Sequence, residues 1–337
     1  MKKLLSLLMV LAMVLALAAP AFADEAEGET VTVLYTNDVH TYIDKDLNYT
    51  VAAQYRDTLD NVLLVDAGDH IQGTAYGSMD KGKTIIDLMN AAGYDVATLG
   101  NHEFDYGMEG CMNAIEWAEF PYVSCNFYHE ENGEKGENVL EAYKVFEIGG
   151  QKIAFIGVTT PESFTKSTPA YFQDEDGNYI YGIAGGEDGS DLYATVQEAI
   201  DAASAEADVI IGLGHLGVDP ASKPWTSEEV IANTTGLDAF IDGHSHTEVP
   251  MQEVADADGN PVILTQTGSY FNNLGQMTIA PDGTITTELL TPDDVKAALY
   301  DSFVEKLYAG ELTVDDLEAN VEKIGSGWIG SVNEELG

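Results

Sequence analysis

Five apolar segments of this chain each end in a short polar motif that contains Asp, Asn or His. Three of them, residues 31–36, 62–65 and 96–99, are short and apolar or β-branched, which predicts β-strands. The motifs that follow them are Thr-Asn-Asp-Val-His, Asp-Ala-Gly-Asp and Gly-Asn-His-Glu-Phe-Asp, and two later segments lead into Gly-His-Leu-Gly and Asp-Gly-His-Ser-His. Open α/β sheets bind ligands at the carboxyl ends of their strands. The sequence therefore predicts one polar site at such an edge.

Helical segments alternate with the strands in the rest of the chain. The alternation predicts an α/β layered domain with substantial parallel pairing. The further elements that we expect are a helix at residues 83–92, a helix at 108–117, strands at 122–125, 152–158, 209–213 and 239–242, and a helix at 191–206.

The last part of the chain has a different pattern. Residues 262–290 are expected to form hairpins that close the domain, with a turn at the Pro-Asp-Gly sequence of residues 281–283. Residues 291–337 are predicted to be a short helical C-terminal extension with helices at 292–307 and 314–324, each preceded by a Thr cap and followed by acids.

The N-terminus has the pattern of a secretory signal. Lys2 and Lys3 precede an apolar run at residues 4–17, and Ala-Phe-Ala occupies residues 21–23. A single-pass anchor is the alternative, and the cleavage-like site favours a signal peptide over residues 1–23. Because no other apolar run approaches about 18 residues, we expect a mature protein that is secreted, extracellular or periplasmic, and that does not use the membrane as a partner.

The chain is strongly acidic. It has 58 Asp and Glu against 14 Lys and Arg, for a formal net charge of -44, and 45% of its residues are hydrophobic. This is a foldable composition with a surface that repels polyanions, so nucleic-acid polymers and anionic lipid surfaces are excluded as main partners. Arg56 is the single arginine, so no group of guanidinium groups can hold a phosphate.

Two smaller features leave alternatives open. Cys111 and Cys125 either form a disulfide or remain as buried free thiols, and the sparse cysteine usage favours thiols. The Asp-Gly-Asn sequences at residues 176–178 and 258–260 suggest either calcium loops or hairpin turns. We expect turns, because the twelve-residue spacing of a calcium loop with its terminal Glu is missing.

The residue types at the strand ends are those of a metal site. Imidazole and carboxylate groups bind borderline and hard divalent ions, and Asp-x-His or His-x-His sequences bring two such groups within reach of one ion. Glycines beside them let the backbone turn sharply. A single such motif is usually structural, but five at successive strand ends indicate a shared site.

These motifs resemble the signature of the calcineurin-like metallophosphoesterases, and in particular the secreted 5′-nucleotidase/UDP-sugar hydrolase branch. The likeness runs from about residue 31 to about residue 290, and the Gly-Asn-His-Glu-Phe-Asp motif is its most specific part. The resemblance implies an α/β four-layer αββα sandwich over residues 24–290. One departure is Thr41, where relatives usually have Gly after the first His.

The resemblance also implies the roles of individual residues. It implies two divalent metal ions, and the nitrogen and oxygen ligands suit zinc, manganese or iron. It also implies a catalytic pair formed by His102 and Asp105. His70 is expected to be structural or to support the ligands, and His129 to be exposed. The implied ligands are Asp38, His40 and His246 for one ion, Asn101, His215 and His244 for the other, and Asp69 between the two.

The implied function is hydrolysis of a small phosphate ester, most plausibly a nucleotide, by metal-activated hydroxide attack. Alternatives are 2′,3′-cyclic-nucleotide or UDP-sugar diester cleavage, hydrolysis of another group such as a sulfur oxyanion ester, and a non-catalytic metal- or ligand-binding surface protein. In the family a second domain supplies the aromatic and arginine residues that recognise the substrate, and the residues after 290 are too few for it. We therefore expect relaxed specificity, a separate chain that completes the site, or loss of the specificity half.

Overall fold

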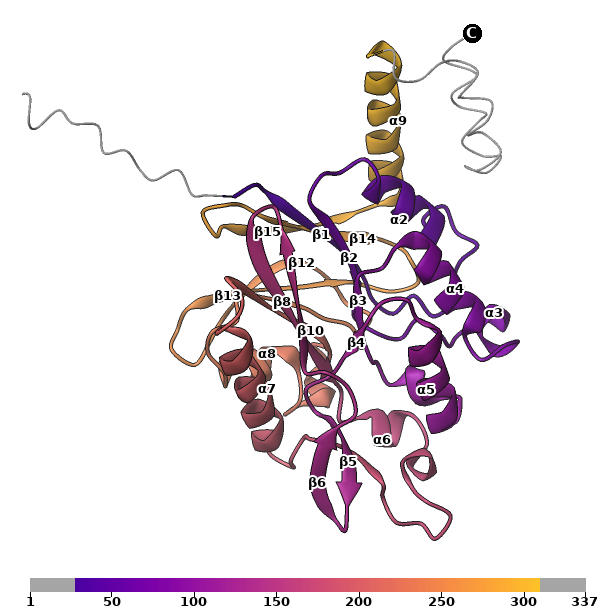
Figure 1. The fold of residues 1–337 in the computed structure, drawn as a ribbon, viewed down its shortest axis with the longest axis vertical. Helices are drawn as coiled ribbons and strands as arrows, with labels where there is room; N and C mark the ends of the chain where they lie inside the picture. The colour runs from indigo at the N-terminus through magenta and orange to yellow at the C-terminus, as the bar shows by residue number, and fades with distance from the viewer. Residues whose placement is uncertain (1–27, 310–337) are drawn as a thin grey trace, which may run out of the picture.

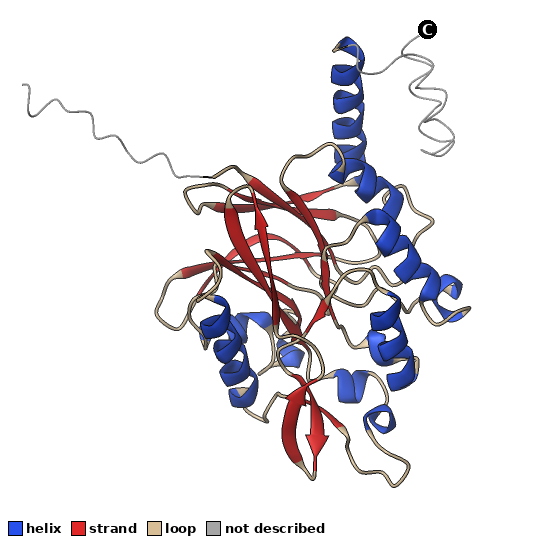
Figure 2. Cartoon of the chain, viewed as in Figure 1, coloured by secondary structure: helices blue, strands red, loops and turns tan. Residues whose placement is uncertain are grey.

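Two six-stranded sheets lie face to face with helices on both outer sides (Figures 1 and 2). The computed structural model describes residues 28–309. Helices α2 (Tyr49–Arg56), α3 (Ala75–Ser78), α4 (Lys83–Ala92) and α5 (Gly107–Trp117) lie on one side in Figure 1, and α7 (Ser190–Ala203) and α8 (Ser227–Ala232) lie on the other. The structure is thus the four-layer αββα sandwich that the resemblance implies.

Parallel pairs form the centre of each sheet, and antiparallel strands lie at one edge of the first sheet and at both edges of the second. In the first sheet β1, β2, β3 and β4 run parallel, and β14 and β15 complete it on the other side of β1. In spatial order this sheet is β15 (Ile285–Leu290), β14 (Leu274–Ile279), β1 (Val31–Thr36), β2 (Val62–Asp66), β3 (Val96–Thr98) and β4 (Tyr122–Val123). The second sheet is β12 (Glu248–Ala255), β13 (Pro261–Thr267), β11 (Ala239–Ile241), β10 (Val209–His215), β8 (Gln151–Thr159) and β7 (Tyr143–Ile148).

The side-chain alternation of the strands separates three hydrophobic cores. In β1, Leu34 packs in the core under α2 and α4, whereas Val33 and Tyr35 point into the core between the two sheets. In β11, Phe240 packs in the core under α7 and α8, and Ala239 and Ile241 face the other sheet. Each central strand is therefore buried on both faces, which explains its continuous apolar sequence.

Within residues 28–309, the predicted helices and the predicted single strands are confirmed with shifts of at most three residues at their ends, β1 and α4 with none. The expectation for residues 262–290 was only partly right. The hairpin of β14 and β15 turns at Pro281-Asp282-Gly283 as expected, but β13 belongs to the other sheet, where it pairs with β11 and β12. That one strand follows another closely in the sequence does not determine which of two stacked sheets it joins.

Several strands were not predicted, because they are polar or partly exposed and lack a buried apolar run. They are β7, β12 and the small sheet of β6 (Glu134–Asn138), β5 (Phe127–Glu131) and β9 (Tyr181–Ile183). The remaining short elements are α6 (Ser163–Lys166) and the 3₁₀ turns η1 (His102–Phe104), η2 (Pro169–Phe172) and η3 (Pro220–Ser222).

The smaller expectations are confirmed in the described residues. Cys111 and Cys125 are buried free thiols. Both Asp-Gly-Asn sequences form turns, in which Asp174 and Asp256 each accept hydrogen bonds from backbone N–H groups two and four residues on.

The C-terminal helix α9 (Pro292–Tyr308) begins at a capping box between Thr291 and Asp294 and projects from the body of the fold (Figure 1). The expected signal peptide at residues 1–23 and the helix at 314–324 lie outside the described residues. Between residues 28 and 309, no helix combines the length and apolar character that crossing a membrane requires.

The packing under α7 and α8 yields a stability prediction. The Phe240 ring lies against Gly212 and Gly214 of the neighbouring strand, where a Cβ atom would clash with it. Phe240→Ala should therefore lower the free energy of unfolding by about 3–5 kcal/mol in urea titrations, through lost burial and a residual cavity. Met79 is 85% exposed, and Met79→Ala should stay within about 0.5 kcal/mol of the wild type. A loss below about 1 kcal/mol for Phe240→Ala would contradict this packing.

Candidate metal centre

The strand ends of both sheets converge on one site. The predicted ligands therefore come from three strands of the first sheet and two of the second, and the packing of the sheets brings them together. They are Asp38 and His40 after β1, Asp69 after β2, Asn101 after β3, His215 at the end of β10, and His244 and His246 after β11.

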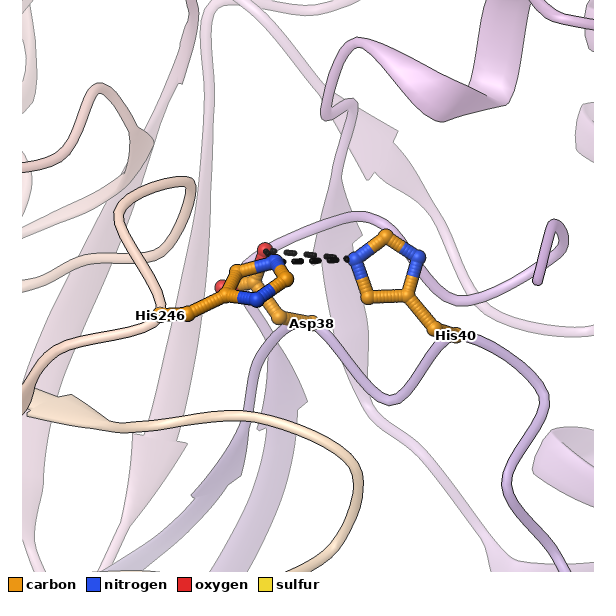
Figure 3. A group of neighbouring side chains, drawn as sticks. All are labelled: Asp38, His40 and His246. Atoms are coloured by element: carbon orange, nitrogen blue, oxygen red, sulfur yellow. Dashed lines mark hydrogen bonds and ion pairs between the residues drawn. The ribbon is translucent and has the colours of Figure 1, made fainter.

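Asp38, His40 and His246 form the first group (Figure 3). His40 Nε2 lies 3.0 Å from His246 Nε2, and His246 Nε2 lies 3.3 Å from Asp38 Oδ1. The two imidazoles come from different sheets and point at the same carboxylate oxygen. Two nitrogens and one oxygen at this spacing form a partial coordination shell for one divalent ion.

Asp69, His215 and His244 form the second group. His215 Nε2 lies 3.0 Å from Asp69 Oδ2, and His244 Nδ1 lies 2.8 Å from Asn101 Oδ1. Asp69 Oδ2 is also 3.8 Å from His40 Nε2 of the first group. Asp69 thus lies between the two groups, in the position that the resemblance implies for a bridging carboxylate.

Hydrogen bonds to backbone carbonyls fix which imidazole nitrogen faces the site. His40 Nδ1 lies 3.0 Å from the carbonyl oxygen of Gln72, and His215 Nδ1 lies 2.6 Å from that of Ala67. Because a carbonyl oxygen only accepts, each Nδ1 carries a proton and each ring turns its Nε2 toward the site. Those are the atoms that a metal ion would bind.

Two buried atoms at the centre of the site have no hydrogen-bond partner. They are Asp38 Oδ1 and His215 Nε2, and both side chains are fully buried. An unsatisfied buried carboxylate oxygen and imidazole nitrogen are costly unless something binds them. A divalent ion fits this donor set, because both atoms are ligand atoms for borderline metals.

Negative charge in the site is buried and shifts the pKa of its neighbours. Burial lowers the pKa of His215, but the charges of Asp69 and Asp38 outweigh burial and raise this pKa to about 10. Burial likewise opposes ionisation of Asp69, and His215 nevertheless holds the pKa of this carboxyl well below its usual range. The same excess of negative charge favours a divalent cation, which binds carboxylates and unprotonated imidazoles in place of protons.

His102 and Asp105 lie together beside the two groups. His102 Nδ1 lies 2.6 Å from Asp105 Oδ2, and the backbone N–H of His102 donates to Asp69 Oδ1 at 2.8 Å. Burial lowers the pKa of His102, but the hydrogen bond with Asp105 and the charge of Asp69 raise it to about 9. Asp105 therefore orients a His102 ring that is protonated at neutral pH and 30% exposed.

Glu162 is a member of the site that the sequence analysis missed. Its Oε2 lies 2.8 Å from His244 Nε2 and accepts a hydrogen bond from Ser222 Oγ at 2.6 Å. The carboxylate holds a proton on Nε2, so His244 turns its Nδ1 toward Asn101 and the second group. Glu162 follows β8 at the same sheet edge, and that position after a predicted strand was the available signal.

Glu103 is a second residue that the sequence analysis left without a role. Its buried carboxylate accepts hydrogen bonds from the backbone N–H groups of Asp69 and Gly100, at 2.8 and 2.7 Å, and from that of His70 at 2.9 Å. Glu103 therefore ties the loop after β2 to the loop after β3. These two loops carry the ligand-type side chains of Asp69 and Asn101.

The other two histidines lie where they were expected. His70 is buried behind the site, with Nδ1 2.8 Å from Asp66 Oδ1 and Nε2 2.6 Å from the Tyr122 hydroxyl. His129 is exposed on β5. Neither belongs to the two ligand-type groups.

Backbone strain is concentrated at the site. Non-glycine residues rarely adopt positive φ, and such residues cluster at functional sites. Thr41 has a φ of 61°, which explains why glycine suits this position in relatives, and its Oγ1 accepts the backbone N–H of Thr74 at 2.7 Å. The predicted ligands with positive φ are Asp38 (49°), His40 (49°), Asp69 (63°), His244 (77°) and His246 (54°).

A steric limit explains one glycine of the last motif. A Cβ on Gly243 would lie 2.7 Å from His215 Nδ1 and 2.9 Å from the carbonyl oxygen of Ala67. It would therefore intrude on the hydrogen bond that orients His215. The loop after β11 passes this close only because residue 243 has no side chain.

A cavity of about 340 Å³ opens beside the ligand-type groups. Its lining includes the His102 ring, so the cavity joins the predicted catalytic pair to both groups. The lining residues are Asp69, Asn101, His102, Lys166, Asp219, Ser222, His244, Ser245 and His246.

Comparison with known proteins points to one family. A family model described as bacterial capsule synthesis protein PGA_cap matches residues 61–265. The chain is 29% identical over 293 residues to the trifunctional nucleotide phosphoesterase protein YfkN of Bacillus subtilis, covering 77% of this chain and 19% of that protein. It is 30% identical over 292 residues to human 5′-nucleotidase, covering 75% of this chain and 46% of that one. The chain thus spans less than half the length of these curated relatives.

One solved structure matches this chain over the whole length of that structure. The crystal structure of calcineurin-like phosphoesterase YfkN from Bacillus subtilis matches with a TM-score of 0.61 and 25% sequence identity. The match covers 85% of this chain and 100% of that chain. The two chains therefore share the four-layer fold.

The contact between Glu162 and His244 predicts a change in metal affinity. Glu162→Gln removes the charge that holds the proton on His244 Nε2, and it should weaken Zn²⁺ or Mn²⁺ binding by about 10- to 100-fold in calorimetric titrations. Glu187 is exposed and belongs to neither group, so Glu187→Gln should bind the same ions as the wild type does. Equal affinity in the two variants would show that Glu162 does not orient a ligand.

Proposed function

Because the chain belongs to the calcineurin-like metallophosphoesterases, in the branch of the 5′-nucleotidases, we propose that it is an exported dinuclear-metal hydrolase of phosphate esters. One observation carries the proposal: two groups of ligand-type side chains, with Asp69 of the second group 3.8 Å from His40 of the first, lie beside a cavity that His102 also lines. Export is supported by the signal-like sequence of residues 1–23.

We assign the ligands from the two groups of side chains. Asp38, His40 and His246 would hold one ion, and Asp69 would bridge it to a second ion. The ligands of that second ion would be Asn101, His215 and His244. Bound divalent ions polarise phosphoryl oxygens and lower the pKa of water so that it can act as a nucleophile at neutral pH. Nitrogen and oxygen ligands of this kind suit zinc, manganese or iron.

His102 acts on the phosphoryl group or on the leaving oxygen. Asp105 holds the proton on His102 Nδ1 at 2.6 Å, which leaves Nε2 as the second proton-bearing atom of the imidazolium. The hydrogen bond with Asp105 favours the protonated ring. Nε2–H can then donate to a phosphoryl oxygen as negative charge develops, or pass its proton to the departing oxygen.

Nucleotides are the substrates that we favour. The relatives named above are a nucleotide phosphoesterase and a 5′-nucleotidase. The name "trifunctional" of the Bacillus subtilis relative supports a comparison of monoesters with diesters. A panel of AMP, UDP-glucose and 2′,3′-cyclic AMP, with the products identified by chromatography, separates these classes, because in a single hydrolysis step only AMP releases inorganic phosphate.

The function is tested with p-nitrophenyl phosphate and its bis ester. The purified metal-loaded protein should hydrolyse at least one of them and lose activity to a chelator. His102→Ala should keep its metal content and lose about 10²- to 10⁴-fold in kcat, because general acid–base catalysis contributes that much. His129→Ala, on exposed β5, is the matched control and should be unaffected. A metal-replete protein inert toward every phosphate ester would refute the proposal.

A further inference from the structure

The cavity beside the metal centre has one wall to which no role has been assigned. That wall contains Lys166, Asp219 and Ser222. Lys166 is the last residue of α6, which follows β8, and Ser222 is the last residue of η3, which follows β10. Both segments leave strands of the second sheet at the edge where the metal centre lies.

The position of Lys166 is tied to the metal centre through Glu162. The Glu162 carboxylate contacts His244 and Ser222, and the backbone carbonyl of Glu162 accepts the N–H of Lys166 at 2.7 Å. Residues four apart on a helical turn lie on the same face. The same residue thus contacts His244 with its side chain and begins, with its backbone carbonyl, the turn that ends at Lys166.

Lys166 provides the positive charge of this cavity. It is the one Lys or Arg among the lining residues, and the acids on that lining are Asp69 and Asp219. Across residues 28–309, Lys166 forms no ion pair, whereas Lys83 and Lys223 each pair with an acid. Asp219 uses one carboxylate oxygen to accept the backbone N–H of Ala221. His244 and Ser222 lower the pKa of the Glu162 carboxyl through hydrogen bonds, and the charge of Lys166 adds to this effect, but the Lys166 and Glu162 side chains form no ion pair. The Lys166 ammonium thus remains available to a ligand in a chain with few cations.

Arginine does not compete for this role. The single arginine, Arg56, pairs with Asp95 at 3.3 Å and is absent from the cavity lining. A phosphate ester in the cavity carries anionic oxygens, and those that do not contact a metal ion would still need a donor. A lysine binds such an oxygen as a point charge through one of three N–H donors.

We propose that Lys166 is a substrate-binding residue whose ammonium binds an anionic phosphate oxygen of the ester in this cavity. The inference rests on the proposed phosphoesterase function and deepens it. Lys166 takes the anion-binding role within this domain, without a contribution from arginine. Because its charge acts on the substrate both before and during the reaction, its loss should raise KM and leave kcat nearly unchanged.

Lys166→Gln tests this role by kinetics and by binding of inorganic phosphate. With p-nitrophenyl phosphate, KM should rise about tenfold, the size of one charge-assisted hydrogen bond at a partly exposed site. The dissociation constant for inorganic phosphate, measured by calorimetry on the metal-loaded protein, should rise by the same factor. Lys166→Arg should restore most of both. Lys223→Gln is the matched control, because Lys223 is exposed, paired with Glu229 and absent from the cavity lining.

The outcomes separate this inference from the function itself. An active wild type whose Lys166→Gln variant keeps KM and phosphate affinity within twofold would overturn the role of Lys166 and leave the function standing. A variant that loses metal or melting temperature along with activity, and that Lys166→Arg does not rescue, would make Lys166 a structural residue. If the wild type is inert toward every ester, the function fails, and the calorimetric comparison still decides whether Lys166 binds phosphate.

Discussion

The buried carboxylates of Asp38 and Asp69 are the constraint on which the site depends. Burying a charge is costly unless it is paired and hydrogen-bonded. The structure meets this cost at the junction of two sheets, where imidazoles from β10 and β11 face carboxylates after β1 and β2. The apolar core between the sheets holds the strands in the register that makes this possible.

Rigid supports around the ligand-type residues explain how such a cluster persists. Glu103 ties two loops together through backbone N–H groups, and backbone carbonyls orient His40 and His215. The left-handed backbone at Asp38 and Asp69 is strained, and it is held because the surrounding bonds leave no alternative. The same supports leave Asp38 Oδ1 and His215 Nε2 without a hydrogen bond, although each faces a group of opposite charge, at positions where a cation could bind.

The sequence predicts the parts of this molecule that depend on local pattern. We could predict the strand ends, the helix faces and the motifs that contain Asp38 and His40, because a few neighbouring residues determine each of them. Glu162 could not be assigned, because its contact with His244 links residues 82 apart in sequence. The sheet that β13 joins and the cavity position of Lys166 likewise follow from tertiary packing, which single-sequence patterns do not encode.

The central claim is that the two groups of side chains hold two divalent ions that share Asp69. Anomalous diffraction from crystals soaked in Zn²⁺ or Mn²⁺, collected at the absorption edge of the ion, tests it most directly. The account predicts two peaks, one in contact with Asp38, His40 and His246 and the other with Asn101, His215 and His244, with Asp69 touching both. A single peak, or peaks away from these side chains, would contradict it.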